Sequence, residues 1–202
     1  MASEILFASN NPGKIREVRE ILAELGLTVI SQSEYGVTDA EETGLTFIEN
    51  AIIKARHAAR LSMLPALADD SGLEVDALNG SPGVFSARYA GIGASDADNN
   101  AKLIKALECV PHSSRTARFR CVMAYLRHAD DPSPVIAEGI WEGVLLDEPR
   151  GSGGFGYDPY FFVPEKGCTS AELSAEIKNN LSHRGQALRR MAAELIRLSS
   201  GR

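Results

Sequence analysis

The sequence is poor in cysteine, and its three cysteines, Cys109, Cys121 and Cys168, lie far apart. They form no Cys-x-x-Cys pair and no cluster with histidine, which are the patterns of structural zinc sites. Three widely spaced thiols also make no disulfide framework of the kind that stabilises small secreted proteins. We therefore expect reduced thiols in the core of a cytoplasmic protein.

Positive charge and long apolar runs are also scarce. The chain has 21 Lys and Arg against 27 Asp and Glu, a formal net charge of −6, whereas proteins that hold nucleic acid on a broad surface are usually basic. The first apolar run, residues 5–8, is far too short for a signal peptide or a membrane span, and no basic segment precedes it. We expect no nucleic-acid partner, no membrane partner and a cytoplasmic location.

Nothing in the composition marks a linker. Hydrophobic residues make up 44% of the chain and charged residues 24%, both ordinary for a globular protein. No low-complexity run divides the sequence. A chain of 202 residues can fill one sizeable core but is short for two domains. The sequence therefore predicts a single domain over residues 1–202.

The chain begins with strand and helix patterns. Residues 5–8 predict a buried strand, the apolar spacing from residue 15 to Leu25 predicts a helix, and residues 28–30 predict a second strand. The first turn, Ser9-Asn10-Asn11-Pro12-Gly13-Lys14, offers small residues, a helix N-terminus and a lysine, which suit a phosphate group. It lacks the glycine spacing of a P-loop, and an ordinary turn is the alternative.

A capping-box pattern opens the next predicted helix. Thr46 and Glu49 have the spacing of that motif, and apolar residues from 47 to 59 form one helical stripe. Lys54 lies off the stripe, where a solvated position is the default interpretation. Glu41 and Glu42, just before the helix, are either loop charges or part of a cation site.

Two adjacent carboxylates then interrupt an apolar run. We interpret residues 64–68 as the end of a buried strand and Asp69-Asp70-Ser71-Gly72 as the turn that leaves it. Both carboxylates would then lie at the carboxyl end of a strand, where ligands of α/β proteins commonly bind. Adjacent ionised carboxylates repel each other, and a hard cation such as Mg²⁺ would relieve the repulsion. A plain turn is again the alternative.

The second half carries one further informative loop. A surface loop is expected at residues 78–89, helices from 96, around 172–180 and after 182, and strands at 116–125, 135–146 and 160–163. Residues 150–159 hold four glycines with Phe155 and Tyr157. Such a loop either lets a flat ring stack against it or places its aromatic rings in the core. His183 either caps the last helix or lies on a packed surface, since a lone histidine is usually no ligand.

Six motifs, in order, resemble the inosine triphosphate pyrophosphatase family over nearly the whole chain. They are Ser-Asn-Asn-Pro-Gly-Lys at 9–14, Phe-Ile-Glu-Asn-Ala at 47–51, Ala-Asp-Asp-Ser-Gly-Leu at 68–73, Pro-Gly-Val-Phe-Ser-Ala-Arg-Tyr at 82–89, Gly-Phe-Gly-Tyr-Asp-Pro at 154–159 and Ser-His-Arg at 182–184. The first motif begins with Ser9-Asn10, where related proteins often have Thr-Gly or Thr-Asn.

The resemblance implies a role for each matching residue. Metal-binding carboxylates fall on Glu41 and Asp70, Asp70 is also the proton acceptor, and Mg²⁺ is the implied metal. Lys54 approaches the phosphates. The other substrate contacts fall on Ser9, Asn10, Asn11, Pro12, Gly13 and Lys14 for the phosphates, Phe155, Gly156, Tyr157 and Asp158 for the base, and Ser71, Lys178, His183 and Arg184 elsewhere on the nucleotide.

The resemblance also implies a fold and an activity. The fold is mixed α/β, with a twisted, elongated sheet and flanking helices that form two lobes around a nucleotide cleft, and two chains form a homodimer. The activity is Mg²⁺-dependent hydrolysis of deaminated purine nucleoside triphosphates (ITP, dITP, XTP) to the monophosphate and pyrophosphate. This reaction removes such nucleotides before they enter DNA or RNA.

Two other hypotheses account for part of the pattern. A nucleotide-binding regulator without turnover would keep the loops but lack a carboxylate, whereas this chain keeps Glu41, Asp69 and Asp70. A related pyrophosphatase for modified pyrimidine nucleotides is disfavoured by the motifs at 155–158 and 182–184.

Overall fold

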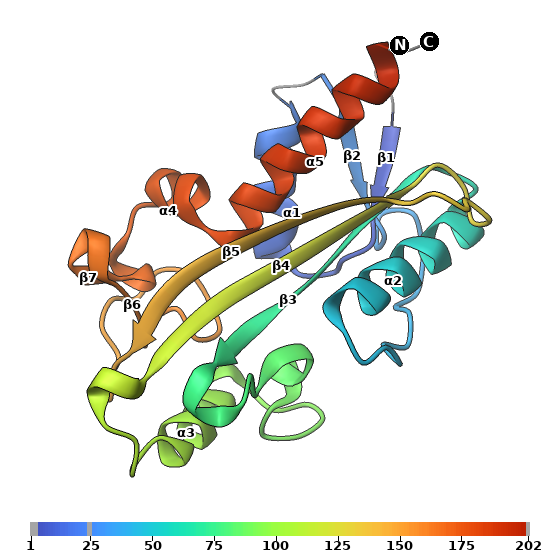
Figure 1. The fold of residues 1–202 in the computed structure, drawn as a ribbon. Helices are drawn as coiled ribbons and strands as arrows, with labels where there is room; N and C mark the ends of the chain where they lie inside the picture. The colour runs from blue at the N-terminus through green and yellow to red at the C-terminus, as the bar shows by residue number, and fades with distance from the viewer. Residues whose placement is uncertain (1–3, 24–25, 201–202) are drawn as a thin grey trace. The chain divides into compact units, whose positions relative to one another are not determined.

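The structure, a computed structural model, describes residues 4–23 and 26–200. In this part the chain forms a twisted, mixed sheet with the strand order β2-β1-β3-β4-β5-β6-β7 (Figure 1). The strands are β1 (Glu4–Phe7), β2 (Thr28–Ser31), β3 (Ala66–Val75), β4 (Thr116–Leu126), β5 (Val135–Leu145), β6 (Phe161–Val163) and β7 (Cys168–Thr169). The helices are α1 (Pro12–Ala23), α2 (Phe47–Ser62), α3 (Asp96–Ala106), α4 (Ala175–Leu181) and α5 (His183–Ser200), with short 3-10 helices η1 (Asp76–Leu78), η2 (Gly83–Arg88), η3 (His112–Ser114), η4 (Pro164–Lys166) and η5 (Ser170–Glu172). The predicted mixed α/β class is confirmed.

The chain divides into two compact units, each made of separate segments. Unit 1 consists of the described residues of Met1–Asp70, Cys121–Gly139 and Arg184–Arg202, and unit 2 consists of Ser71–Arg120 and Ile140–His183. The strands β3, β4 and β5 contribute residues to both units. The single domain expected over residues 1–202 stays a prediction.

Unit 1 is built on three parallel strands. β1 pairs in parallel with β2 and β3, so that Phe7 lies opposite Ser31 on one side and Leu67 on the other. Side chains alternate between the two faces of a strand. Phe7 and Leu67 therefore share one face, where they pack with apolar residues of α1 and α5. α2 contacts β1 from the opposite face (Figure 1).

The first two strands and the first two helices predicted for unit 1 are present, but the predicted end of the first helix lies outside the described residues. Strands β1 and β2, and helix α1 between them, fall where the apolar pattern predicts them. Leu25, which closed the predicted helical stripe, lies outside the described residues. Helix α2 begins with the predicted capping box, because the Thr46 hydroxyl accepts from the Glu49 N–H and the Glu49 carboxylate accepts from the Thr46 N–H.

The interpretation of residues 64–72 as a strand end and a turn is wrong. β3 runs without interruption from Ala66 to Val75, so Asp69, Asp70 and Ser71 lie in the middle of a strand. The turn-forming tendency of Asp, Ser and Gly gives way here because both carboxylates find cationic partners within unit 1, as described below. With those partners, two charged residues can be buried inside a sheet.

Unit 2 has a core of its own. Phe119, Trp141 and Phe161 stack in a tilted cluster, with Phe119 and Phe161 ring centroids 4.5 Å apart. Leu73, Leu103 and other apolar side chains from β3, α3, β5 and β6 surround them. β6 pairs antiparallel with both β5 and β7. The loop expected at residues 78–89 contains the short helices η1 and η2.

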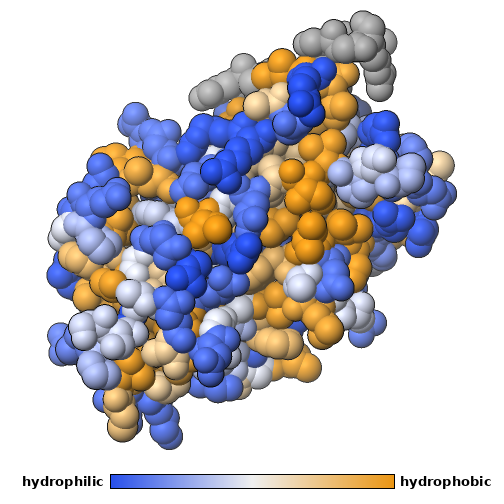
Figure 2. Space-filling view, viewed as in Figure 1, coloured by the Kyte–Doolittle hydropathy of each residue, from blue (hydrophilic) through white to orange (hydrophobic). Residues whose placement is uncertain are grey.

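On the face drawn in Figure 2, hydrophobic side chains gather in a band to the right of the centre, with hydrophilic residues around it. Among the described residues, no helix is long and apolar enough to cross a membrane. All three cysteines are free, as expected, and Cys121 is buried. Cys109 is exposed, so its predicted core position is wrong. The apolar residues around it, Leu107 and Val110, carry the packing there instead.

Candidate functional site

The turn after β1 is shaped by its own side chains. The Asn11 side-chain oxygen accepts hydrogen bonds from the N–H groups of Gly13 (2.9 Å) and Lys14 (3.1 Å), and the Asn11 N–H donates to the Ser9 hydroxyl. Asn11 therefore acts as the cap of α1. The Asn10 amide donates to Asp39 at 2.9 Å. The Asn11 side chain thus satisfies the first N–H groups of α1, and the turn places Lys14 in the first turn of that helix.

Asp69 lies at the centre of a buried group of charges. Its carboxylate is 1% exposed and accepts from the ammonium of Lys14 at 2.9 Å and from Nε of Arg184 at 3.4 Å. Arg184, at the start of α5, also donates to Glu17 of α1 at 2.7 Å. Burial on its own would raise the pKa of Asp69, but the charges of Lys14, Arg184 and Lys54 outweigh it and hold that pKa well below its usual range. Asp69 is therefore ionised near neutral pH.

Asp70 has a separate set of partners. Its carboxylate accepts from the Lys54 ammonium at 2.9 Å and from the Asn50 amide at 3.2 Å, and both side chains come from α2. Lys54 also donates to Glu42 at 2.8 Å. Burial raises the pKa of Asp70; Lys54 opposes that rise and the like charge of Glu42 adds to it. For Lys54, burial lowers the pKa, but Asp70, Asp69 and Glu42 raise it above its usual value.

The two adjacent carboxylates thus point to opposite faces of β3. Asp69 meets residues of α1 and α5, whereas Asp70 meets residues of α2, as the two-residue period of a strand requires. The repulsion that we expected a metal to relieve between Asp69 and Asp70 is instead countered by separate cations. Asp69 is consequently no candidate to share a metal with Asp70 across the strand.

The chemistry of the Asp70 surroundings fits a divalent cation. Asp70 and Glu42 both approach the Lys54 ammonium, and burial raises the pKa of Asp70, with a smaller contribution from the like charge of Glu42. Mg²⁺ prefers one or two protein carboxylates and completes its shell with phosphate oxygens and water. Within residues 4–23 and 26–200, no three His, Cys, Asp or Glu side chains gather into a metal-binding group. Protein ligands alone would therefore leave such an ion with open positions.

Glu41 occupies a different place from its neighbour. Its side chain is exposed and makes no hydrogen bond or ion pair with any residue in the described part of the chain. Glu42, which was only an alternative in the sequence analysis, contacts Lys54 instead. The assignment of Glu41 and Asp70 as metal ligands stays a prediction.

In unit 2, the glycine-rich loop is organised by Asp158. One carboxylate oxygen accepts from the Phe155 N–H at 2.8 Å and from the Lys178 ammonium at 2.6 Å, and the other accepts from the Ser170 hydroxyl at 2.8 Å. A Cβ atom on Gly154, which has φ of +76°, would run into the Asp158 carboxylate. Glycine is therefore required at residue 154 for the loop to close on Asp158.

The two aromatic residues of this loop have different environments. Tyr157 is 5% exposed, belongs to the unit 2 core and donates from its hydroxyl to the Ser86 carbonyl at 2.7 Å. Phe155 is 37% exposed, and the Lys178 ammonium lies 5.2 Å from its ring centroid. The core interpretation therefore holds for Tyr157, whereas the Phe155 ring is partly exposed and stays a predicted stacking surface.

The remaining predicted residues of unit 2 are Ser71 and His183. Ser71 lies within β3 and is half-buried. His183 is 6% exposed and its ring stacks on Phe119, with centroids 4.9 Å apart and an interplanar angle of 16°. His183 is the first residue of α5, and its stacked ring agrees with the packed position expected as one alternative.

Each unit thus brings together part of the predicted set. Lys14, Lys54, Asp70 and Arg184 gather in unit 1 with the turn after β1, and Phe155, Asp158 and Lys178 gather in unit 2. Among the residues that hold these groups, Glu17 and Asn50 had no predicted site role, whereas Glu42 and Asp69 were predicted only as alternatives for a cation site. Glu17 had a usable signal, because a position three residues after Lys14 lies on the same helix face. Asn50 likewise precedes Lys54 by one helical turn.

Replacing Asp69 with asparagine should destabilise the fold by about 3 kcal/mol at neutral pH, because Lys14 and Arg184 lose a buried counter-charge. The lowered pKa means that the stabilisation is complete above the ordinary Asp value of about 3.9 and fades as the pH falls below it. Urea unfolding of wild type and Asp69→Asn from pH 3 to 8 measures this difference. Asp130→Asn, at an exposed position, is the control and should leave stability unchanged. A difference that persists undiminished at pH 3 would contradict the explanation.

Gly154 and Gly156 offer a matched pair of substitutions. Both have positive φ, +76° and +62°, but only at Gly154 does a Cβ meet other atoms. Gly156→Ala should therefore cost about 1 kcal/mol of stability from backbone strain alone. Gly154→Ala should cost about 2 kcal/mol more, since it also displaces the Asp158 carboxylate. Equal losses in urea unfolding would show that the contact with Asp158 does not constrain the loop.

Comparison with known proteins identifies relatives along almost the full chain. The sequence model of the Ham1 family matches residues 5–194. A protein of Thioalkalivibrio sulfidiphilus named dITP/XTP pyrophosphatase is 64% identical over 186 residues, which cover 92% of this chain and 95% of the relative. A protein of Escherichia coli O157:H7 with the same name is 57% identical, covering 92% and 94% respectively.

Solved structures agree with the sequence comparison. A HAM1 protein from Coxiella burnetii has a TM-score of 0.90 at 53% identity, covering 96% of this chain and 99% of the other. The Ham1 protein of Staphylococcus aureus has a TM-score of 0.84 at 43% identity, covering 96% and 98%. The resemblance found from six motifs is thus confirmed, and the chain belongs to the Ham1 family.

Proposed function

We propose that this protein hydrolyses deaminated purine nucleoside triphosphates, such as ITP, dITP and XTP, to the nucleoside monophosphate and pyrophosphate. The observation that carries the proposal is the group formed by Lys54, Asp70 and Glu42, beside the Lys14 turn in the same unit. Relatives that share more than half of their residues with this chain are named dITP/XTP pyrophosphatase. The regulator alternative is weakened because the buried carboxylate and its cations are all present.

The cations of unit 1 would reduce the charge repulsion that is the main obstacle to the reaction. A triphosphate carries several negative charges, which repel an attacking water and destabilise the leaving pyrophosphate. Lys14 and Lys54 already lie in a half-buried, charge-compensated setting. On substrate binding, phosphate oxygens would take over part of the role that Asp69 and Asp70 play toward these ammonium groups.

Asp70 is placed to handle the attacking water. Its carboxylate is fixed by Lys54 and Asn50, so it can orient a water molecule and accept its proton. We propose Glu41 and Asp70 as the ligands of Mg²⁺, with Glu42 as a nearby carboxylate. When bound, the ion would neutralise phosphate charge and polarise the reacting phosphorus–oxygen bonds. Asn50 and Lys54 keep the carboxylate in one orientation throughout.

The unit 2 loop would supply the base contacts. The exposed Phe155 ring offers a stacking surface, which favours any purine without choosing among them. Selection needs hydrogen-bond donors, because hypoxanthine and xanthine carry a carbonyl at position 6 where adenine carries an amino group. Backbone N–H groups are donors of this kind, and adenine would leave them unpaired, whereas Arg184 is already bonded to Asp69 and Glu17. Following the family resemblance, we also propose that the protein acts as a homodimer.

The test is the product released from ITP, with ATP and GTP alongside, in the presence and absence of Mg²⁺. We expect pyrophosphate rather than orthophosphate, a preference for ITP over ATP and GTP, and no turnover without the metal. Asp70→Asn, which keeps the size of the side chain, should lower kcat by at least about a hundredfold.

Asp131→Asn provides a matched control for this assay. Asp131 is a buried carboxylate of the same unit, but it binds Arg127 and the Ser133 N–H in the turn between β4 and β5. The Asp131→Asn variant should be less stable than wild type, without a loss of kcat comparable to that of Asp70→Asn. Orthophosphate as the product, or tight ITP binding without turnover, would overturn the proposal. Faster hydrolysis of dTTP or UTP would favour the pyrimidine alternative.

A further inference from the structure

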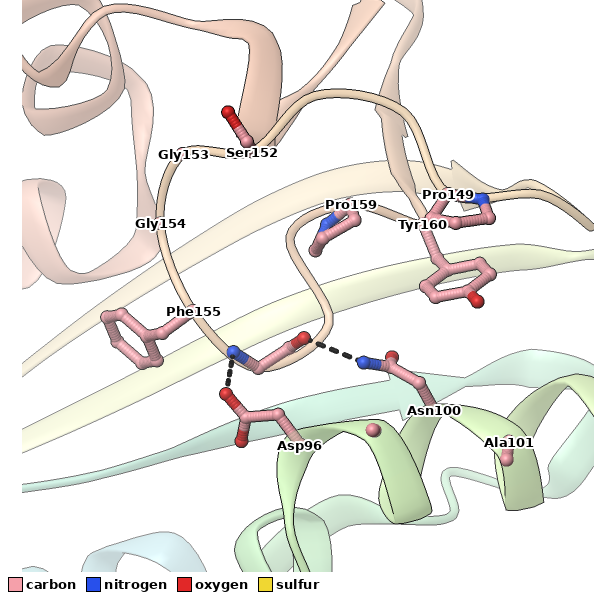
Figure 3. Close-up of a pocket in the computed structure, with 12 residues that line it drawn as sticks. Asp96, Asn100, Ala101, Pro149, Ser152, Gly153, Gly154, Phe155, Pro159 and Tyr160 are labelled. Atoms are coloured by element: carbon pink, nitrogen blue, oxygen red, sulfur yellow. Dashed lines mark hydrogen bonds between the residues drawn. The ribbon is translucent and has the colours of Figure 1, made fainter.

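Two side chains of α3 hold the backbone of Gly156 in the glycine-rich loop. The Asp96 carboxylate accepts from the Gly156 N–H at 2.7 Å, and the Asn100 amide donates to the Gly156 carbonyl at 2.9 Å (Figure 3). Asp96 and Asn100 are four residues apart and therefore lie on one face of the helix. Together they occupy both backbone hydrogen-bonding groups of one residue.

This contact fixes the residue between the two aromatic rings. Phe155 is tied through its N–H to Asp158, and Tyr157 is tied through its hydroxyl to Ser86. Gly156 has φ of +62° and no side chain to pack, so its position depends on its backbone bonds. Figure 3 shows the loop descending to the first turns of α3, with the Phe155 ring directed away from the two α3 side chains.

The side of the loop that faces α3 borders a cavity. A cavity of about 400 Å³ lies between α3 and the loop, lined by Ala97, Ala101, Pro149, Gly154 and Tyr160 among others. Asn100 is 7% exposed, and its side-chain oxygen has no hydrogen-bond partner in the described part of the chain. The orientation of its amide is therefore set by the Gly156 carbonyl. An open cavity supplies no packing that could replace the two hydrogen bonds.

We propose that Asp96 and Asn100 are positioning residues that set the Phe155 ring for stacking on the substrate base. This inference rests on the proposed function, in which Phe155 contacts the base. Neither residue touches the reacting phosphates. Losing either hydrogen bond frees Gly156 and with it the backbone that carries Phe155. Affinity for the base therefore decreases, while the hydrolysis of the phosphate bond is unaffected.

The experiment compares Asn100→Ala and Asp96→Ala with Asp96→Asn, whose amide oxygen can still accept from Gly156. IMP and pyrophosphate serve as competitive inhibitors of ITP hydrolysis, since IMP carries the base and pyrophosphate lacks it. We expect both alanine variants to raise the inhibition constant of IMP and the KM for ITP about fivefold to tenfold. The inhibition constant of pyrophosphate and kcat should stay within about twofold. Asp96→Asn should restore most of the IMP affinity.

Asn99→Ala is the matched control. Asn99 is also a buried asparagine of α3, but it bonds the Ala90 N–H and the Ala87 carbonyl instead of the glycine-rich loop. It should lower stability by a similar amount and leave the inhibition constant of IMP unchanged. Hydrogen exchange of the Gly156 amide should accelerate in Asn100→Ala and Asp96→Ala but not in Asn99→Ala.

The outcomes separate this inference from the function on which it rests. If wild type releases pyrophosphate from ITP and the alanine variants keep the IMP inhibition constant of wild type, the positioning role is wrong. A parallel loss of IMP and pyrophosphate affinity, or an equal effect of Asn99→Ala, would also overturn it. If wild type does not hydrolyse ITP, the proposed function itself fails, and the hydrogen-exchange result alone decides whether α3 holds the loop.

Discussion

Two charged residues in the middle of a strand impose the constraint on which unit 1 depends. An ionised carboxylate that is taken out of water needs a cation or several hydrogen bonds, or it becomes protonated. β3 contains two such residues in succession, and alternation sends them to opposite faces. Each face must therefore supply its own compensation. The helices that cover the sheet do so with Lys14 and Arg184 for Asp69, and with Lys54 and Asn50 for Asp70.

This compensation explains why the ends and turns of particular helices are arranged as they are. The Asn11 cap starts α1 so that Lys14 lies in its first turn, near Asp69. The capping box of α2 fixes the register that places Asn50 and Lys54 one helical turn apart. Local sequence signals thus decide which cations reach which carboxylate. In the proposed function, the same cations bind the triphosphate. The same side chains would therefore contribute both to stability and to substrate binding.

Much of the architecture could be predicted from the sequence, because periodicity and capping are local signals. Short stretches of sequence are enough to predict the capping box of α2, the apolar stripe of α1 and the strands β1, β2 and β6. The sequence predicts a turn where the structure has the middle of β3, because Asp-Asp-Ser-Gly has the composition of a turn. Only Lys14, Lys54 and Arg184, which are distant in sequence from Asp69 and Asp70, make a strand possible there.

The site residues that could be predicted from the sequence are mainly those that belong to the six motifs. The six motifs located most of the residues that gather in each unit. They could not show that Tyr157 is buried and Phe155 exposed, because both are aromatic neighbours of glycine. Nor could they indicate Asp96 and Asn100, since a polar pair on a helix face usually meets solvent. Their role becomes visible only from the backbone groups that they bind.

We infer that Asp69 and Asp70 are adjacent in sequence but separate in role. This separation is tested by the Mg²⁺ dependence of ITP hydrolysis in wild type, Asp69→Asn and Asp70→Asn, measured at a temperature where all three are folded. We expect Asp69→Asn to keep the Mg²⁺ half-saturation of wild type within about twofold, while Asp70→Asn loses the Mg²⁺-dependent rate. A shifted Mg²⁺ half-saturation in Asp69→Asn, together with wild-type behaviour of Asp70→Asn, would contradict it.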